Sequence, residues 1–98
     1  MSHETHKVTR FAKVAPFTLR VEFADGSTQV IDFQRVLRGE LYGPLQNPFL
    51  FDRVELDPEA HTLVWPNGAD FDPATLHNWP EEGPKLEALA RSWKVPAK

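Results

Sequence analysis

Acidic and imidazole side chains gather in and just after the stretch VWPNGADFD, residues 64–72. Asp70 and Asp72 are followed by His77, and carboxylate and imidazole groups are common ligands of divalent metals. A metal-dependent enzyme that uses these three residues is therefore one hypothesis. The spacing is unlike that of known metal loops, because a calcium loop needs more acidic ligands and a terminal Glu, and zinc needs further His or Cys ligands.

Structural roles account for the same residues. Asp72 stands before a proline, which is typical of a helix N-cap. The pair Asn67-Gly68 is a turn signal, and Asp70 is expected to accept amide hydrogens within the loop. We therefore interpret the stretch as scaffold and predict no metal ligand and no cofactor.

The sequence carries no other recognisable catalytic arrangement. His3 and His6 form an H-x-x-H pair, but they lie near a terminus that is expected to fray, so we attribute the spacing to chance. No serine lies in a nucleophile elbow, no glycine spacing forms a phosphate-binding loop, and cysteine is absent. We predict no catalytic residue and expect that the protein is not an enzyme.

The three tryptophans are the features most suggestive of binding, because Trp is enriched where interfaces are anchored. Trp65 and Trp79 are expected to belong to the core, whereas Trp93 lies on a terminal helix whose apolar stripe could meet this chain or another. The candidate partner-binding residues come from the turn and from this stripe: Trp65, Asn67, Asp70, Leu86, Leu89 and Trp93.

The composition is that of one small globular domain. The chain has 98 residues, of which 41% are hydrophobic, and a formal net charge of −3. Because no basic patch is present, binding to nucleic acid is not expected. No apolar run is long enough for a membrane span or a signal peptide, so we expect a cytoplasmic protein that does not bind membranes.

A β-hairpin is predicted in the first half of the chain. Residues 17–23 alternate between apolar and polar side chains, as a half-buried strand does. A two-residue turn would place Asp32 opposite Leu19. A three-residue loop with Gly26 in the left-handed conformation instead pairs Leu19 with Ile31, so we prefer that register.

Further strands are expected on either side of this hairpin. Residues 6–16 lack a clean alternation, which is typical of a bulged or edge strand. Residues 54–56 and 62–65 flank a proline turn and form the second hairpin. His61 sits where that turn needs a left-handed residue, a conformation that His tolerates better than most.

Two short helices are predicted between the hairpins. The first covers residues 33–41, with Asp32 as its N-cap and Gly39 placed to stop it. The second is a single turn that begins after Asn47, an N-cap before a proline. It is expected to pack Phe49 and either Leu50 or Phe51 onto the sheet.

Two more helices are predicted after the second hairpin. One covers residues 74–79 and is closed by Pro80. The other is opened by a Gly-Pro pair and covers residues 85–94, with Glu87 and Arg91 as an ion pair across one turn. Because so short a helix does not persist alone in water, its apolar stripe must dock.

These elements predict an α+β fold, with a small antiparallel β-sheet of about five strands in two hairpins and short helices packed on it. An additional C-terminal helix completes the fold. Residues 1–5 are expected to form a frayed N-terminus, residues 6–80 a single α+β domain, and residues 81–98 the C-terminal helix and tail.

About residues 6–79 resemble a known family. The most specific segment is LVWPNGADFDPATLHNW, residues 63–79, in which a Trp-Pro-Asn-Gly turn leads through an aspartate-rich segment into a short helix. The leading strand, the Asp-Gly hairpin and the Asn-Pro turn agree in order and spacing. Together these features resemble the bacterial family known as domain of unknown function 2442.

The resemblance implies an α+β fold with no established enzymatic activity and no catalytic residues to carry over. It also implies a small cytoplasmic protein, often encoded beside a small protein of the domain of unknown function 4160 type. That pairing resembles a toxin and antitoxin arrangement, with the present chain in the antitoxin-like role. Some relatives carry a helix-turn-helix after this domain, but the residues after Trp79 allow only one helix here.

The leading hypothesis is a non-enzymatic protein-interaction module, antitoxin-like or regulatory, that binds a small partner protein. Its contacts would come from a sheet edge, the turn at residues 65–72 or the stripe at residues 86–93. The alternative is a DNA-associated transcriptional regulator that acts as a dimer, and the metal-dependent enzyme described above is a further alternative. The sequence leaves open the partner, homodimer formation, the proline isomers and whether the last helix packs in cis or in trans.

Overall fold

A computed structural model describes residues 6–93 of the chain. Within these residues, five strands form two antiparallel sheets, one in the order β1-β2-β3 and the other β4-β5. The strands are β1 (Val8–Ala15), β2 (Thr18–Phe23), β3 (Thr28–Asp32), β4 (Glu55–Asp57) and β5 (Thr62–Val64). The helices are α1 (Gly39–Tyr42), α2 (Pro48–Phe51), α3 (Pro73–His77) and α4 (Trp79–Ala90), with 3-10 helices η1 (Gln34–Val36) and η2 (Gly43–Gln46).

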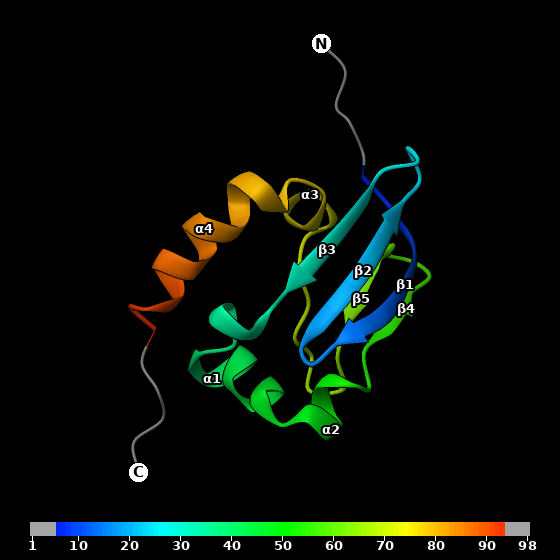
Figure 1. The fold of residues 1–98 in the computed structure, drawn as a ribbon. Helices are drawn as coiled ribbons and strands as arrows, with labels where there is room; N and C mark the ends of the chain where they lie inside the picture. The colour runs from blue at the N-terminus through cyan, green and yellow to red at the C-terminus, as the bar shows by residue number, and fades with distance from the viewer. Residues whose placement is uncertain (1–5, 94–98) are drawn as a thin grey trace.

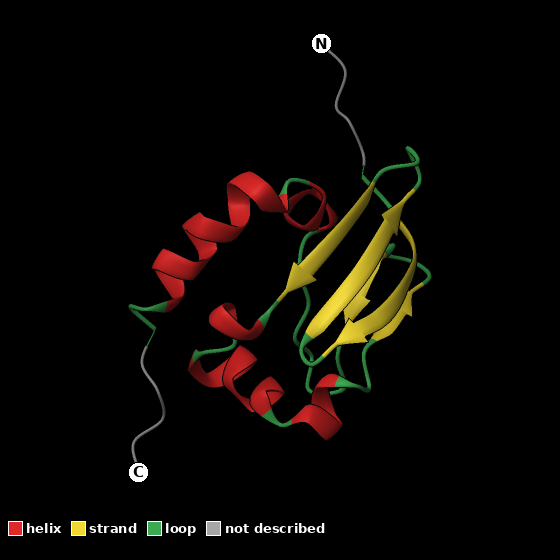
Figure 2. Cartoon of the chain, viewed as in Figure 1, coloured by secondary structure: helices red, strands yellow, loops and turns green. Residues whose placement is uncertain are grey.

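This architecture confirms the predicted α+β class, although the strands are divided between two sheets instead of forming one (Figures 1 and 2). In Figure 1, α3 and α4 lie on the β3 side of the three-stranded sheet, and α1 and α2 lie below it. The β4-β5 hairpin lies behind that sheet, where β4 contacts β1. In the described part of the chain, no helix combines the length and the apolar character that a membrane crossing requires.

The β2-β3 hairpin has the predicted register. Leu19 pairs with Ile31, and Gly26 has a φ of 89°, the left-handed conformation expected of the three-residue loop. The amide of Phe23 donates to the carbonyl of Ser27 at 2.9 Å and closes the loop. This register directs the apolar side of both strands into the core, where Leu19 and Ile31 are buried.

Strand β1 is an edge strand of its sheet with two irregularities in its pairing to β2, as predicted. The following turn contains Pro16 and Phe17, and Phe17 has a φ of 56°. The prediction that the next strand begins at residue 17 is therefore wrong by one residue, because Phe17 belongs to the tight turn between the paired residues Ala15 and Thr18 and has a positive φ.

The β4-β5 hairpin is confirmed. Leu56 pairs with Leu63, and His61 has a φ of 54°, the left-handed conformation that the sequence predicts. The carbonyl of His61 accepts a hydrogen bond from the amide of Val8 at 2.9 Å. This bond connects the second hairpin to the start of β1.

The helix predicted over residues 33–41 is interrupted. Asp32 Oδ1 accepts the amide hydrogen of Gln34 at 3.0 Å, but the N-cap of η1 is Phe33 and not the predicted Asp32, and the helical turn ends at Val36. Gly39 has a φ of 81°, which prevents a right-handed helix from continuing through this residue, so the first helical turn does not extend past it and Gly39 is the first residue of α1. A Cβ atom at Gly39 would lie in ordinary van der Waals contact with Trp93, at 3.4 Å from its Cβ, so it is the positive φ that requires glycine at this position.

The predicted cap of α2 is confirmed, because Asn47 Oδ1 accepts the amide hydrogen of Phe49 at 2.9 Å. Phe51 is fully buried, whereas Phe49 is 82% exposed. The prediction that Phe49 packs on the sheet is therefore wrong. Residues two apart in a helical turn point to nearly opposite sides, so one turn buries only one of these two rings.

The boundary between the last two helices also differs from the prediction. Helix α3 ends at His77, and α4 begins at Trp79 and runs through Gly83 and Pro84. Pro80 therefore opens α4 and does not close α3, because a proline in the first turn of a helix loses no internal hydrogen bond. The bonds before Pro66 and Pro80 are both trans.

The core lies between the inner face of the three-stranded sheet, the β4-β5 hairpin and the short helices. Its buried aromatic residues are Phe23, Phe33, Phe51, Phe71 and Trp65. Trp65 and Trp79 pack in or against this core, as predicted. The last helix docks on its own chain, since Ala90 is fully buried and Leu86 packs against the core.

Candidate functional site

The structure does not bring together Asp70, Asp72 and His77, the residues of the alternative hypothesis of a metal-dependent enzyme. Asp72 caps the N-terminus of α3 by accepting the amide hydrogen of Ala74 at 3.0 Å, and His77 is the last residue of the same helix. Asp70 lies in the preceding turn, where it forms a β-bridge with Val64. Within residues 6–93 no loop amide donates to the Asp70 carboxylate, so the predicted role of that group is also wrong.

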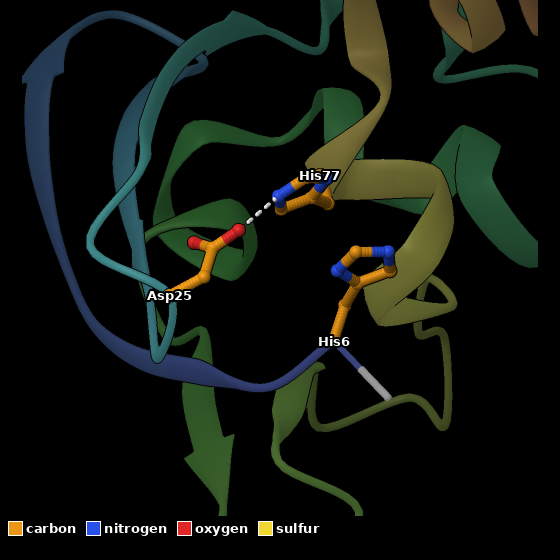
Figure 3. A group of neighbouring side chains, drawn as sticks. All are labelled: His6, Asp25 and His77. Atoms are coloured by element: carbon orange, nitrogen blue, oxygen red, sulfur yellow. Dashed lines mark hydrogen bonds and ion pairs between the residues drawn. The ribbon is translucent and has the colours of Figure 1, made fainter. Parts of the chain in front are cut away.

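His77 instead meets Asp25 and His6, residues that the sequence analysis did not connect with it (Figure 3). His77 Nε2 lies 2.7 Å from Asp25 Oδ2, and the rings of His6 and His77 stack with centroids 3.9 Å apart. One ligand atom from each residue lies within 4.8 Å of the other two. We call these three residues the His-Asp cluster.

Three separate segments build the His-Asp cluster. His6 comes from the segment just before β1, Asp25 from the β2-β3 loop and His77 from α3 (Figure 3). The second histidine of the H-x-x-H pair, His3, lies outside the described residues. The sequence offers no local signal for the cluster, because Asp25 and His77 are 52 positions apart and each has an adequate local interpretation as turn or helix residue.

The Asp25 carboxylate is oriented by its own loop. Its Oδ1 atom accepts hydrogen bonds from the backbone amide and the hydroxyl of Ser27, at 2.9 and 2.6 Å. These two bonds, together with the hydrogen bond to His77, hold the pKa of Asp25 well below its usual range. The carboxylate is therefore ionised at neutral pH, with Oδ2 directed at His77.

The imidazole of His77 is fixed on its other sides. Its Nδ1 atom lies 3.1 Å from the side-chain oxygen of Asn78, and the ring of Phe23 contacts it edge-on with centroids 5.0 Å apart. The His77 carbonyl accepts a hydrogen bond from the Gln29 side chain at 2.8 Å, which joins the end of α3 to β3. The ring position is thus set by the strand and by the helix together.

A second candidate site forms around α1. Asn67 donates a side-chain hydrogen bond to the carbonyl of Leu41 at 2.9 Å, and the Tyr42 hydroxyl donates to the carbonyl of Asp70 at 2.7 Å. Tyr42 also stacks on Trp93, with ring centroids 5.7 Å apart. We call these five residues the α1 surface.

The α1 surface contains an open hollow of about 350 Å³. Leu41 at its margin is 44% exposed, and Tyr42 and Trp93 are partly exposed. Burial, and secondly the charge of Asp70, raises the pKa of Tyr42, so its hydroxyl stays protonated as a donor at neutral pH. The hollow is lined by Arg38, Gly39, Glu40, Leu41, Tyr42 and Trp93.

The six predicted partner-binding residues have different positions. Asn67, Asp70 and Trp93 meet at the α1 surface. Leu89 is 53% exposed on α4, while Leu86 packs against the core. Trp65 is only 3% exposed, and its indole nitrogen donates to the carbonyl of Phe51 at 2.9 Å, so its side chain has almost no surface to offer a partner.

Sequence reasoning missed Leu41 and Tyr42, which connect these positions. Tyr42 is the single tyrosine of the chain and follows Leu41 in a segment that was expected to be the end of a helix. Only the tertiary fold, in which α1 approaches both the turn after β5 and the end of α4, shows their role.

Comparison with known proteins supports the family that the sequence resembles. The model of the family described as "Protein of unknown function (DUF2442)" matches residues 12–82, which is more than half of the chain. Neither a curated protein nor a solved structure matches. The match contains the β2-β3 hairpin, α1, the turn after β5 and α3. The chain therefore belongs to the DUF2442 family.

Proposed function

We propose that this protein is a non-enzymatic protein-interaction module that binds a small partner protein through the α1 surface. The observation that carries the proposal is the convergence at α1 of Asn67, Asp70 and Trp93, which come from two segments far apart in the sequence. An aromatic pair beside an open apolar hollow is the kind of surface on which interface hot spots form.

The α1 surface is pre-organised, which favours binding. The Asn67 side chain and the Tyr42 hydroxyl are fixed by hydrogen bonds to backbone carbonyls, and the Trp93 ring stacks on Tyr42. Groups already held in place lose little conformational entropy when a partner binds. Leu41 and Leu89 add exposed apolar area on neighbouring elements.

The partner follows from the family resemblance. Members of the family are often encoded beside a small protein of the domain of unknown function 4160 type, in an arrangement that resembles a toxin and antitoxin pair. We therefore propose an antitoxin-like or regulatory role, in a bacterial cytoplasm, toward the product of the adjacent gene. Formation of a homodimer through the same surface is the competing arrangement.

Co-expression tests this proposal directly. The full chain is expressed together with the product of the adjacent gene, and only one of the two carries an affinity tag. We expect co-purification in a fixed ratio and a change in the activity or toxicity of the partner. Absence of co-purification, together with unchanged activity of the partner, would discard the proposal. Light scattering of the chain alone reports whether the surface is used for a homodimer.

The DNA-associated alternative has one observation in its favour. Arg35, Arg38 and Arg91 line a hollow beside α4 together with Glu87. The Glu87 carboxylate pairs with Arg35 and with Arg91, each at 3.6 Å, which offsets part of the positive charge. A gel-shift experiment at low salt tests it, and binding that weakens steeply with added salt is the result that the DNA hypothesis requires.

A further inference from the structure

We propose that the His-Asp cluster of His6, Asp25 and His77 is a binding site for a first-row divalent transition-metal cation, for which Zn²⁺ is the best probe. The site is separate from the α1 surface and does not depend on the proposed partner. The three residues offer two imidazole nitrogens and one carboxylate oxygen within 4.8 Å of one another. That donor set is one that zinc and related metals accept, with a remaining position for water.

The surroundings of His77 favour a positive charge, supplied by a second ring proton or by a metal ion. Its Nδ1 faces the side-chain oxygen of Asn78 at 3.1 Å, and its Nε2 faces Asp25 Oδ2 at 2.7 Å. A neutral imidazole has only one N–H, so it can donate to only one of these two oxygens. If Nδ1 donates to Asn78, the lone pair of Nε2 points toward a carboxylate. A proton on Nε2 or a metal ion shared with Asp25 resolves this repulsion.

The distances are compatible with a shared ion. At a metal–ligand distance of about 2.1 Å, ligand atoms in a tetrahedral site lie about 3.4 Å apart. The separation of 2.7 Å between His77 and Asp25 is shorter than this value, and the upper limit of 4.8 Å within the cluster is longer. To bind a cation, side-chain rotations would have to move the ligand atoms of His77 and Asp25 slightly apart and bring the ligand atom of His6 closer to them.

The groups behind the ligands have the arrangement that metal sites use. Ser27 holds the second carboxylate oxygen of Asp25 with two hydrogen bonds, which leaves Oδ2 directed at the cluster. Asn78 contacts the imidazole nitrogen that faces away from Asp25 and helps to hold the ring with Nε2 directed at the Asp25 carboxylate. Such supporting contacts orient ligands before the metal arrives, and the exposed carboxylate of Asp25 gives the ion a path of entry.

The donor types decide the class of ion. Two of the three donors are nitrogen atoms, whereas Ca²⁺ and Mg²⁺ prefer oxygen ligands throughout. Imidazole suits zinc, copper, iron and nickel. A bound ion would connect the segment before β1, the β2-β3 loop and α3, so it would stabilise the folded chain by mass action.

Calorimetric titration with Zn²⁺ tests the proposal on the full chain, purified without a histidine tag and freed of metal with a chelator. We expect one Zn²⁺ per chain and a higher melting temperature in its presence. The variants His77→Ala and Asp25→Asn should each weaken Zn²⁺ binding by more than about 10-fold. The matched control His61→Asn keeps a residue that tolerates the left-handed conformation and should bind Zn²⁺ as the wild type does.

A measurement on the wild-type chain tests the same site without depending on whether the variants fold. Paramagnetic Co²⁺ is added and the histidine ring signals are followed by NMR, with the expectation that His6 and His77 shift or broaden well before His61. The absence of stoichiometric Zn²⁺ binding would overturn the proposal and assign the Nε2 position of His77 to a proton. The proposal would also be overturned if His61→Asn lost as much Zn²⁺ affinity as the variants of His77 and Asp25 do. Unchanged Zn²⁺ binding after replacement of both Asp25 and His77 would overturn it as well.

Discussion

His77 Nε2 lies 2.7 Å from Asp25 Oδ2, although 52 positions separate the two residues in the sequence. The contact joins the tip of the β2-β3 hairpin to the end of α3, and the Gln29 side chain reinforces it from β3. A carboxylate on a tight turn and a histidine on a short helix thus become one polar site at the surface.

The first prediction concerns the acidity of Asp25. Replacing Ser27 with alanine removes the hydroxyl donor, which contributes most to stabilising the Asp25 carboxylate. We expect the pKa of Asp25 to rise toward its usual range in Ser27→Ala. Titration of the side-chain carboxyl carbon by NMR measures it. An unchanged pKa would show that Ser27 does not determine the state of this carboxylate.

A second prediction concerns stability at alkaline pH. Burial raises the pKa of Tyr42 above the ordinary value of 10.0, so the unfolded chain loses this proton at a lower pH than the folded chain does. The contribution of protonated Tyr42 to the free energy of unfolding is complete below about pH 10. It is lost as the pH rises through the pKa that Tyr42 has in the folded chain. Ultraviolet absorbance reports the titration without ambiguity, because Tyr42 is the single tyrosine.

The matched variant is Tyr42→Phe. It loses the hydrogen bond to the Asp70 carbonyl, which should cost about 1 kcal/mol at neutral pH. Its free energy of unfolding should then fall less steeply than that of the wild type above pH 10. If the free energy of unfolding fell equally steeply in both proteins above pH 10, the raised pKa of Tyr42 in the folded chain would be contradicted.

The third prediction concerns the start of α3. Asp72→Ala removes the acceptor for the Ala74 amide and should lower the free energy of unfolding by about 1 kcal/mol. Asp72→Asn keeps a capping oxygen and should lose much less. Urea unfolding of the two variants measures the difference, and equal losses would mean that the cap does not stabilise this helix.

A fourth prediction concerns Gly83 inside α4. Replacing a helical glycine with alanine usually stabilises a helix by about 1 kcal/mol. Here an added Cβ atom would lie 2.6 Å from the indole nitrogen of Trp79, so we expect Gly83→Ala to destabilise the protein by about 1–3 kcal/mol. The loss should be smaller in a Trp79→Phe background, and stabilisation by Gly83→Ala alone would disprove the close packing.

Local signals in the sequence predicted much of the fold. The β2-β3 register, the caps at Asn47 and Asp72 and the left-handed His61 all follow from interactions within a few residues. The predicted helix boundaries were wrong where one residue can belong to either of two adjacent short helices. Whether Pro80 ends one helix or begins the next depends on how Trp79 packs, and packing is a tertiary property.

The candidate sites were less predictable for the same reason. Asp25 and His77 have complete local explanations, as a turn residue and a helix residue, and nothing local indicates that they meet. Tyr42 was overlooked because its hydroxyl partner, Asp70, lies 28 positions away. The residues Asn67, Asp70 and Trp93 were predicted from turn chemistry and helix periodicity. The role of α1, which contacts all three, was not predicted.

The binding affinity for the product of the adjacent gene, measured by calorimetry, tests the central claim most directly. Leu41→Glu places a charge on the α1 surface, and Val30→Glu places the same charge on β3, where Val30 is 62% exposed. We expect Leu41→Glu to weaken binding by more than about 10-fold, a loss of about 1.4 kcal/mol, and Val30→Glu to leave it unchanged. No binding by the wild type, or equal affinity in both variants, would contradict an interaction through the α1 surface.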